Sequence, residues 1–462
     1  MGPTGTAGRG MFGYDERTAE AVFAYCRERL SEDPVPLDHP VPKAQLEAAL
    51  EGFITAQGRD PVAVLKVFTE TVVRSVISCD SPRFLAFVPA APTKASLLFD
   101  MVVSASSLQG TSWLEAAGAV IAENQALAFL ATTAGMPASA GGCFVSGGSA
   151  ANLSALVVAR DMGAARLARR GQVRPPRVAV SDTAHASVGK ALHMLGVAPL
   201  VVETTGHRLT GGALELALRD DPDPGTVVAV VATAGTTNAG IVDDLAGVGE
   251  VARENDLWFH VDGAYGGAAM LSRSAAVKEL FVGSGLADSF AVDPHKWLFA
   301  PFDCAALVYR DPAAAKAVHA QHASYLDPIH SGGNEEWNPS DYAYHLTRRA
   351  RGLAFWYSLV ANGSDAYSDA VDAALRLAER TAAMVGEYPY LELVRGPGLS
   401  IVLFRRLGWD RADYLAWSTR LLYDEVAFVT PTRWEGETVA RLIFLHPSTT
   451  EDMVREVLGS MA

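Results

Sequence analysis

Short apolar runs alternate with longer amphipathic stretches through most of the chain, from about residue 116 to about residue 445. The short runs are rich in β-branched side chains, whereas the stretches between them repeat apolar residues at helical spacing. We expect strands at seven of the runs: Gly142–Val145, Val178–Val180, Leu200–Val202, Val227–Ala232, Leu257–Val261, Ser289–Val292 and Ala305–Tyr309. Near-continuous apolar strands separated by helices indicate a mainly parallel sheet buried on both faces. The predicted fold class is therefore α/β.

The two ends of the chain follow other patterns. Helical spacing over Thr18–Leu30 and again over 61–77 flanks a proline-rich segment, which predicts an N-terminal helical arm. After Arg349, one long helical stretch precedes three apolar strands with helices between them, which predicts a small C-terminal α+β domain. The predicted divisions are an arm at 1–95, a large domain at 96–350 and a small domain at 351–462.

Composition and charge narrow the class of protein. Of the 462 residues, 49% are hydrophobic and 19% are charged, a balance that favours a compact chain over a disordered one. The formal net charge of −14 argues against nucleic-acid and anionic-membrane partners. The four cysteines lie far apart without the spacing of a metal site, so we expect reduced thiols and no metal. The N-terminus lacks the apolar run of a signal peptide or anchor, which favours a cytoplasmic protein.

Candidate chemistry lies just after the predicted strands, because the carboxyl ends of parallel strands share one edge of a sheet. A Gly-Ser turn at Gly148 opens a helix and offers an anion site suited to a phosphate. Asp262 ends one apolar strand, Lys296 follows another, and His185 follows a third. A buried carboxylate needs a cationic partner, and a desolvated lysine becomes a nucleophile toward carbonyl carbons.

Each feature also has a purely structural explanation: a helix cap at Gly148, a capping carboxylate at Asp262, a surface lysine at Lys296 and a structural histidine at His185. Their occurrence at one edge of one sheet favours a shared function. A phosphate cradle, a strand-end carboxylate, a desolvated lysine and a flat imidazole ring are together what pyridoxal phosphate requires. The lysine would form a Schiff base, and the carboxylate would keep the pyridine nitrogen protonated.

Five motifs occur in an order and spacing typical of a known family: SGGSAANLSAL, SDTAHASVGKA, TAGTTNAGIVDDL, WFHVDGAYGG and ADSFAVDPHKWLFAPFDC. From about Pro82 to the HPSTTEDM segment, the chain resembles the group II pyridoxal-phosphate decarboxylases, which include aromatic-L-amino-acid, glutamate and tryptophan decarboxylases. The resemblance implies the pyridoxal-phosphate-dependent transferase fold of aspartate aminotransferase (fold type I) and pyridoxal 5'-phosphate as cofactor. It also implies decarboxylation of an L-amino acid to the amine and CO2, in a homodimer with shared active sites.

Residue by residue, the resemblance implies that Lys296 is the Schiff-base lysine, that Asp262 is the partner of the pyridine nitrogen and that His185 stacks on the pyridine ring. The other cofactor-binding positions that it implies are Gly148, Ser149, Thr237 or its neighbour Thr236, Ala264 and His295. Asp293 departs from several animal members, which have asparagine there against the phosphate. A carboxylate at this position would repel the phosphate unless it is turned away.

Tyr325 determines which outcome of the reaction we expect. It lies 29 residues after Lys296, in a Gly- and His-rich stretch typical of a mobile loop. In the family, a tyrosine on this loop donates a proton to the substrate α-carbon after CO2 leaves, whereas relatives with phenylalanine tend to oxidise the amine to an aldehyde. The resemblance therefore implies plain decarboxylation, with Lys296, His185, Tyr325 and Asp262 as catalytic residues. The alternatives are a decarboxylating aldehyde synthase, an aminotransferase or, in another class, a catalytically silent binding protein.

Apolar and planar residues ahead of the predicted cofactor domain predict the pocket for the substrate side chain: Phe87, Pro89 and Trp113. They favour an aromatic or bulky apolar amino acid. Val88 and Lys94 stand in place of aromatic residues found in animal aromatic decarboxylases, and Lys94 leaves an acidic or other side chain open as an alternative substrate.

Overall fold

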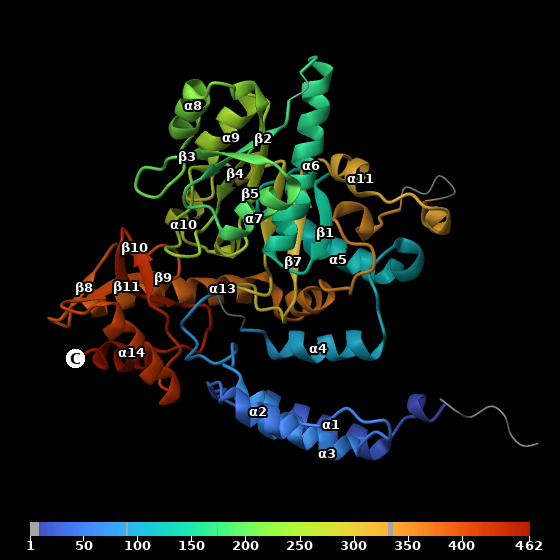
Figure 1. Ribbon diagram of the computed structural model, residues 1–462, viewed down its shortest axis with the longest axis vertical. Coiled ribbons are helices and arrows are strands. Elements are labelled where there is room, and N and C mark those ends of the chain that lie inside the picture. Colours follow the sequence, from blue (N-terminus) through green and yellow to red (C-terminus); the bar gives the residue numbers. More distant parts are fainter. Residues whose placement is uncertain (1–8, 89–90, 173, 331–335) are drawn as a thin grey trace, which may run out of the picture.

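A seven-stranded sheet forms the centre of the computed structural model, which describes residues 9–88, 91–172, 174–330 and 336–462 (Figure 1). The strands lie in the order β1-β7-β6-β5-β4-β2-β3, and only β7 runs antiparallel to its neighbours. Their bounds are β1 Gly141–Val145, β2 Arg177–Ser181, β3 Ala198–Val202, β4 Val227–Thr233, β5 Trp258–Asp262, β6 Ser289–Val292 and β7 Ala305–Tyr309. The predicted mainly parallel α/β sheet is confirmed, and each of the seven predicted strands is present.

Helices cover this sheet. Strands β1, β4, β6 and β7 are buried along their whole length, which explains why their sequences are apolar at every position instead of alternating. The helices of this part of the chain are α4 Lys94–Ala105, α5 Trp113–Thr133, α6 Gly148–Arg169, α7 Ala186–Leu195, α8 Gly211–Asp220, α9 Leu245–Glu254, α10 Ala275–Glu279, α11 Pro312–His319 and α12 Asp327–His330. Among them, α6 packs against five of the strands and begins directly after β1.

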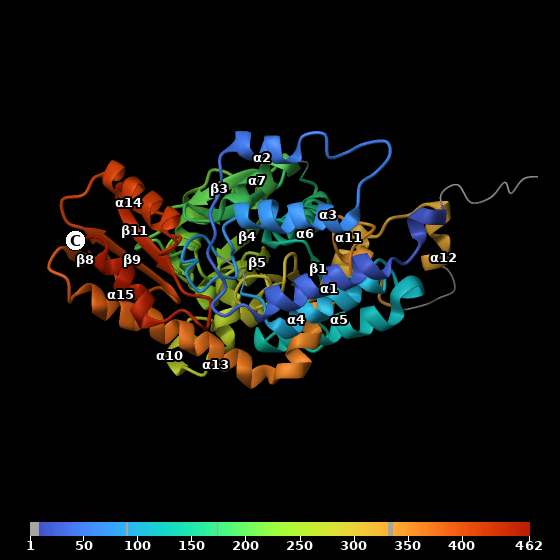
Figure 2. The same cartoon turned by 90° about the horizontal axis from the view of Figure 1, so that it is seen from below.

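The C-terminal part carries a second sheet of four antiparallel strands in the order β10-β11-β9-β8. Helix α13 runs along the molecule and connects the two sheets (Figure 2). The elements are α13 Leu353–Val385, β8 Leu391–Leu393, β9 Ile401–Arg406, α14 Arg411–Tyr423, β10 Thr432–Trp434, β11 Glu437–Ile443 and α15 Glu451–Gly459. The sequence pattern does not predict β10, because its three residues are polar or half-exposed and form an edge strand.

The N-terminal arm consists of three helices that lie apart from the sheet (Figure 1). They are α1 Glu16–Ser31, α2 Lys43–Leu50 and α3 Pro61–Val67, and none of them buries a residue within this chain. The helical stretch predicted over 61–77 is present through Ser75, but only Pro61–Val67 is α-helix, and the stretch continues as a π turn and a 3-10 turn. Its second half contains β-branched residues, which crowd the preceding helical turn. Within the described ranges, no helix is both long and apolar enough to cross a membrane.

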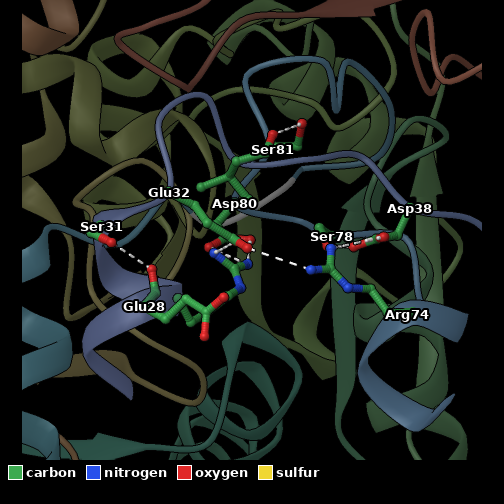
Figure 3. A network of polar contacts seen from close by, with 10 residues as sticks. Glu28, Ser31, Glu32, Asp38, Arg74, Ser78, Asp80 and Ser81 are labelled. Atoms are coloured by element: carbon green, nitrogen blue, oxygen red, sulfur yellow. Dashed lines mark hydrogen bonds and ion pairs between the residues drawn. The ribbon is translucent and has the colours of Figure 1, made fainter. Parts of the chain in front are cut away.

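A polar network attaches this arm to the segment that leads toward the sheet (Figure 3). Arg29 in α1 donates two hydrogen bonds of 2.9 Å to the carboxylate of Asp80. Glu32 receives both Arg29 at 3.4 Å and Arg74 at 3.5 Å, and Arg74 also lies 3.4 Å from Asp38. Because several partly buried charges share these contacts, the network fixes the arm's path more firmly than an isolated surface pair would.

A close backbone contact fixes the loop after β4 against the C-terminal part. Gly240 has a φ of +67°, and a Cβ built on it would lie 1.9 Å from the carbonyl oxygen of Gly398. Only glycine combines this conformation with this approach. The contact holds the loop that contains Thr237, which reaches the site described below.

We expect Gly240→Ala to lower the free energy of unfolding by at least about 3 kcal/mol, because the new methyl group would overlap backbone atoms as well as strain φ. Gly408→Ala is the matched control: Gly408 has a φ of +84°, and no atom lies within 4 Å of the position that a Cβ would take there. It should lose only about 1 kcal/mol. Denaturant unfolding of both variants measures the difference, and equal losses would contradict the packing argument.

Candidate active site

A cavity of about 220 Å³ opens at the carboxyl ends of the parallel strands. Five loops contribute to it, and each follows one of β1, β2, β4, β5 and β6. The predicted site residues that line it together are Gly148, Ser149, His185, Thr237, Asp262, Ala264, His295 and Lys296. The sheet therefore gathers residues separated by up to 148 positions, as expected for the edge where parallel strands end.

Asp262 is the last residue of β5 and is 5% exposed. Asn152 donates a hydrogen bond of 2.8 Å to its Oδ2, and the backbone N–H of Ala264 donates one of 3.1 Å to its Oδ1. No ion pair to Asp262 occurs within the described part of the chain. A buried carboxylate with hydrogen bonds but no cation is costly, so the site favours a ligand that brings a positive charge.

Lys296 lies in the loop after β6 and is partly buried. Its Nζ is 2.8 Å from Oδ2 of Asp293, and the backbone N–H of Gly148 donates to the same oxygen over 3.1 Å. The carboxylate of Asp293 therefore points into the cavity. A phosphate bound at the same place would be repelled by it unless the carboxylate turned away. The other oxygen of Asp293, Oδ1, is buried without a hydrogen-bond partner among the described residues, so this carboxylate retains capacity for a further donor.

His185 caps helix α7. Its Nδ1 accepts a hydrogen bond from the backbone N–H of Ser187 at 3.2 Å and lies 2.8 Å from the Ser187 hydroxyl. These contacts hold the imidazole ring at the cavity wall. The His185 ring therefore caps the helix and also offers a flat surface at the site. The structural and the functional explanation of this histidine both apply.

The start of α6 forms the other wall. Its N-cap is Gly147, which has no side chain to accept from the helix, and the first N–H group, that of Gly148, donates to Asp293 instead. A Cβ on Gly148 would lie 2.8 Å from Cβ of Ala264, and glycine is therefore required for this close approach. His295 lies beside the same wall, and burial lowers its pKa, which favours the neutral ring.

The residues present fit pyridoxal phosphate. The start of α6 suits a phosphate, the carboxylate of Asp262 suits a protonated ring nitrogen, and the amine of Lys296 suits an aldehyde carbon. Groups of three or more potential metal ligands do not occur among the residues that the structure describes.

Two residues that the sequence reasoning missed join the site to the C-terminal part. Buried Arg441 in β11 donates to the carbonyl oxygens of Thr237 at 2.6 Å and Phe87 at 2.9 Å. Burial lowers its pKa to about 10. Tyr265 lines the cavity and hydrogen-bonds to the Ser400 hydroxyl at 2.6 Å. A charged residue within the apolar run of β11 was the one available signal for Arg441.

Thr237 rather than Thr236 lines the cavity. Thr236 is buried, and its hydroxyl accepts a hydrogen bond from the backbone of Ile241. Tyr325 is 71% exposed and Phe87 is 60% exposed, and neither lines the cavity within one chain.

Trp113 begins α5 and does not line the cavity either. Pro89 lies outside the described residues. The roles of Tyr325, Phe87, Pro89 and Trp113 stay predictions.

The pyridoxal-dependent decarboxylase conserved domain matches residues 50–407. The chain belongs to the pyridoxal-dependent decarboxylase family. Family membership confirms the predicted cofactor, pyridoxal phosphate, and the predicted class of enzyme, a carboxy-lyase that acts on amino acids.

Relatives of this decarboxylase act on more than one kind of side chain. The aromatic-L-amino-acid decarboxylase of Bacillus atrophaeus is 32% identical over 435 residues, which cover 92% of this chain and 89% of the relative. The L-2,4-diaminobutyrate decarboxylase of Rhizobium meliloti is also 32% identical, over 82% of this chain and 77% of the relative. The family is thus established, while the amino acid remains to be inferred.

The fold of the decarboxylase agrees with solved structures. Oryza sativa TDC with PLP and tryptamine is 25% identical, with a TM-score of 0.86 over 96% of both chains. The 4-hydroxyphenylacetaldehyde synthase of Rhodiola rosea is 24% identical, with a TM-score of 0.84, and shows the fold alone. The predicted fold of the pyridoxal-phosphate-dependent transferase type is confirmed.

His260 lies two residues before Asp262 and is fully buried, which lowers its pKa from 6.5 to about 4. Between these pH values the unfolded chain binds a proton that the folded decarboxylase does not bind. We therefore expect His260 to make the free energy of unfolding fall by about 1.4 kcal/mol per pH unit as the pH decreases from 6.5 towards 4.

Urea unfolding at several pH values measures this slope. His260→Gln should reduce the slope relative to the wild type, whereas His193→Gln, which alters an exposed ring, is the control. The same slope in His260→Gln as in the wild type would contradict the conclusion that the His260 ring is neutral in the folded protein.

Proposed function

We propose that this protein decarboxylates an aromatic or bulky apolar L-amino acid to the amine and CO2, as a cytoplasmic homodimer. One observation supports the site assignment most strongly: Asp262 is a buried carboxylate without a cationic partner among the described residues, in the same cavity as Lys296. A protonated pyridine nitrogen supplies the missing positive charge, and an aldehyde carbon gives the amine its reaction partner.

Three residues of the chain bind and orient the reacting groups in this proposal. Bound pyridoxal phosphate supplies an electron sink for the electron pair left when the α-carboxylate departs. Lys296 would supply, at Nζ, the amine that holds the cofactor through its aldehyde carbon and that the substrate amine would replace. Asp262 would keep the pyridine nitrogen protonated, and His185 would offer a flat surface to the ring and help to orient the substrate carboxylate.

The phosphate is proposed to bind at the start of α6, beside His295. There it would replace Asp293 as the acceptor for the Gly148 N–H, and the unpartnered oxygen of Asp293 favours a change of position. This exchange would also free Lys296 from its contact with Asp293.

Tyr325 is proposed to donate the proton that the α-carbon takes up after CO2 leaves. It lies on the 3-10 turn Ser324–Leu326, is largely exposed, and is outside the cavity of its own chain. We propose that it acts in the site of the second subunit, when its loop closes over the substrate and excludes water.

The homodimer is supported by large apolar side chains that are exposed in the described part of this chain. They lie on the arm and on helices α4 and α5: Met11, Phe12, Phe23, Leu98, Val102, Leu114 and Ile121. Exposed apolar surface of this extent is typical of an interface. A second copy that covers it would bring Tyr325 and Trp113 toward the neighbouring site.

For the substrate, an aromatic side chain is favoured by the ring of Phe87, which lies 5.5 Å from the ring of Phe428 in an edge-on arrangement and is 60% exposed. The second candidate is a short basic side chain, which the Rhizobium meliloti relative favours. Both candidates use the same reaction at the α-carbon and differ only in the pocket for the side chain.

We expect the purified protein with pyridoxal phosphate to release equal amounts of CO2 and amine from one member of a panel of the twenty standard amino acids, hydroxylated aromatic amino acids and diaminobutyrate. Lys296→Ala should abolish release, because no other amine faces Asp262 among the residues that line the cavity. Lys278→Ala, at an exposed helical lysine, should retain the wild-type rate. Keto acid in place of CO2 would refute the proposal.

Tyr325→Phe should lower amine formation by at least about 100-fold, the usual contribution of a positioned acid, and in air-saturated buffer should shift the product toward aldehyde, ammonia and hydrogen peroxide, with O2 as the oxidant. Product analysis by mass spectrometry and a peroxide assay measure the shift. Tyr423→Phe, which removes an exposed hydroxyl in the C-terminal part, is the control. Unchanged amine yield in Tyr325→Phe would exclude the proposed role.

A further inference from the structure

A chain of buried hydrogen bonds runs from β5 and β6 to Asp262. Trp258 Nε1 donates to the hydroxyl of Ser289 at 2.8 Å, and this hydroxyl lies 2.8 Å from Nδ1 of His260. On the other side of the ring, Nε2 of His260 lies 2.9 Å from Oδ1 of Asn152, whose Nδ2 reaches Asp262 at 2.8 Å. His260 and Ser289 are paired in the register of β5 and β6, so the sheet itself sets the contact.

The chemistry of the two ends gives this chain a single direction. The carboxylate of Asp262 can only accept, so Asn152 turns Nδ2 toward it and Oδ1 toward His260. The Ser289 hydroxyl, which accepts from the indole N–H of Trp258, then donates its own proton to Nδ1 of His260. A neutral ring then carries its proton on Nε2 and donates to Oδ1 of Asn152. The amide is left with Nδ2 facing the carboxylate of Asp262, which accepts.

The opposite direction does not satisfy these groups. With the proton on Nδ1 of His260, the amide of Asn152 would have to turn over to donate to Nε2. Its Oδ1 would then face the carboxylate of Asp262, and two acceptors would be in contact without a proton between them. Burial makes such a contact costly, because Asn152 and His260 are 1% or less exposed. The neutral state of His260 agrees with this assignment.

The same amide also controls the histidine of the site. Its second N–H donates to the hydroxyl of Ser187 over 2.9 Å. Ser187 therefore turns its proton to Nδ1 of His185, 2.8 Å away, while the Ser187 backbone N–H reaches that nitrogen too. With two donors at Nδ1, the neutral His185 ring carries its proton on Nε2, the nitrogen left free for a ligand.

We propose that Asn152 is a positioning residue that fixes Asp262 and His185 together, and that Ser289 and Trp258 hold the His260 ring in the tautomer that keeps the Asn152 amide in place. The inference rests on the proposed roles of Asp262 and His185. It goes beyond them because Trp258, His260 and Ser289 do not line the cavity. A residue outside the site would thus control how firmly the site holds the cofactor.

The test compares two buried serines in the full-length protein. Ser289→Ala removes the link between Trp258 and His260. Ser284→Ala is the matched control, because Ser284 is also buried and loses one hydrogen bond of 2.8 Å, to the carbonyl of Ala134, outside the chain of contacts. Equilibrium titration with pyridoxal phosphate measures the dissociation constant, the absorbance spectrum reports the state of the bound cofactor, and thermal unfolding without cofactor reports the stability of each variant.

We expect Ser289→Ala to weaken cofactor binding about threefold to tenfold and to change the relative heights of the cofactor absorbance bands. Asn152→Ala should weaken binding about tenfold to 100-fold, because it removes a hydrogen bond to a charged group. Ser284→Ala should bind within twofold of the wild type with an unchanged spectrum. If Ser289 had only a structural role, Ser289→Ala and Ser284→Ala would both lower thermal stability and would show the same cofactor spectrum.

Equal binding and equal spectra in Ser289→Ala and Ser284→Ala would overturn the inference and leave the proposed function intact. Failure of the wild type to bind pyridoxal phosphate would instead refute the proposed function. If Ser289→Ala does not fold, Trp258→Phe takes its place, since it removes the donor at the start of the chain and keeps an aromatic ring. A change of threefold or more then supports the inference, and wild-type binding with a wild-type spectrum overturns it.

Discussion

The structure depends on one costly placement, a carboxylate at the buried end of a central strand. Asp262 is held by an amide and a backbone N–H, without a cation among the described residues. A buried carboxylate is tolerated in a folded protein only if it accepts well-formed hydrogen bonds and its negative charge is paired with a positive one. The neighbouring loops follow the same edge of the sheet, so the amine of Lys296 and the start of α6 share the cavity with it. The fold thus builds a site for a cation at one position and for an anion at another.

The C-terminal part contributes to this site although it lies far away in sequence. Arg441 holds the carbonyl oxygens of two loops, one after β4 and one before α4, and Tyr265 hydrogen-bonds to Ser400. Because these contacts are buried, a shift between the two sheets would expose unsatisfied polar groups. The small sheet therefore keeps the cavity in shape, and its own chemistry is not required at the reacting atoms.

Much of this architecture could be predicted from the sequence, and the rest depends on long-range contacts. The strands of the central sheet are recognisable because burial on both faces makes them apolar throughout, and the residues after them were candidates because parallel strands end together. Edge strand β10 was missed because its three residues, none of them buried, carry no such pattern. The orientation of Asp293 and the contacts of His260 were also missed, since both depend on partners from other strands and loops. His260 and Ser289 were visible only as polar residues inside apolar strands.

The most direct test of the central claim is reduction of the cofactor-loaded protein with borohydride, followed by peptide mass mapping. Reduction makes the bond between the cofactor and its lysine permanent. We predict one pyridoxyl group per chain, on the peptide that contains Lys296, and no such group in Asp262→Ala protein incubated at the same cofactor concentration. Attachment to another lysine, or equal attachment in the Asp262→Ala variant, would contradict the account.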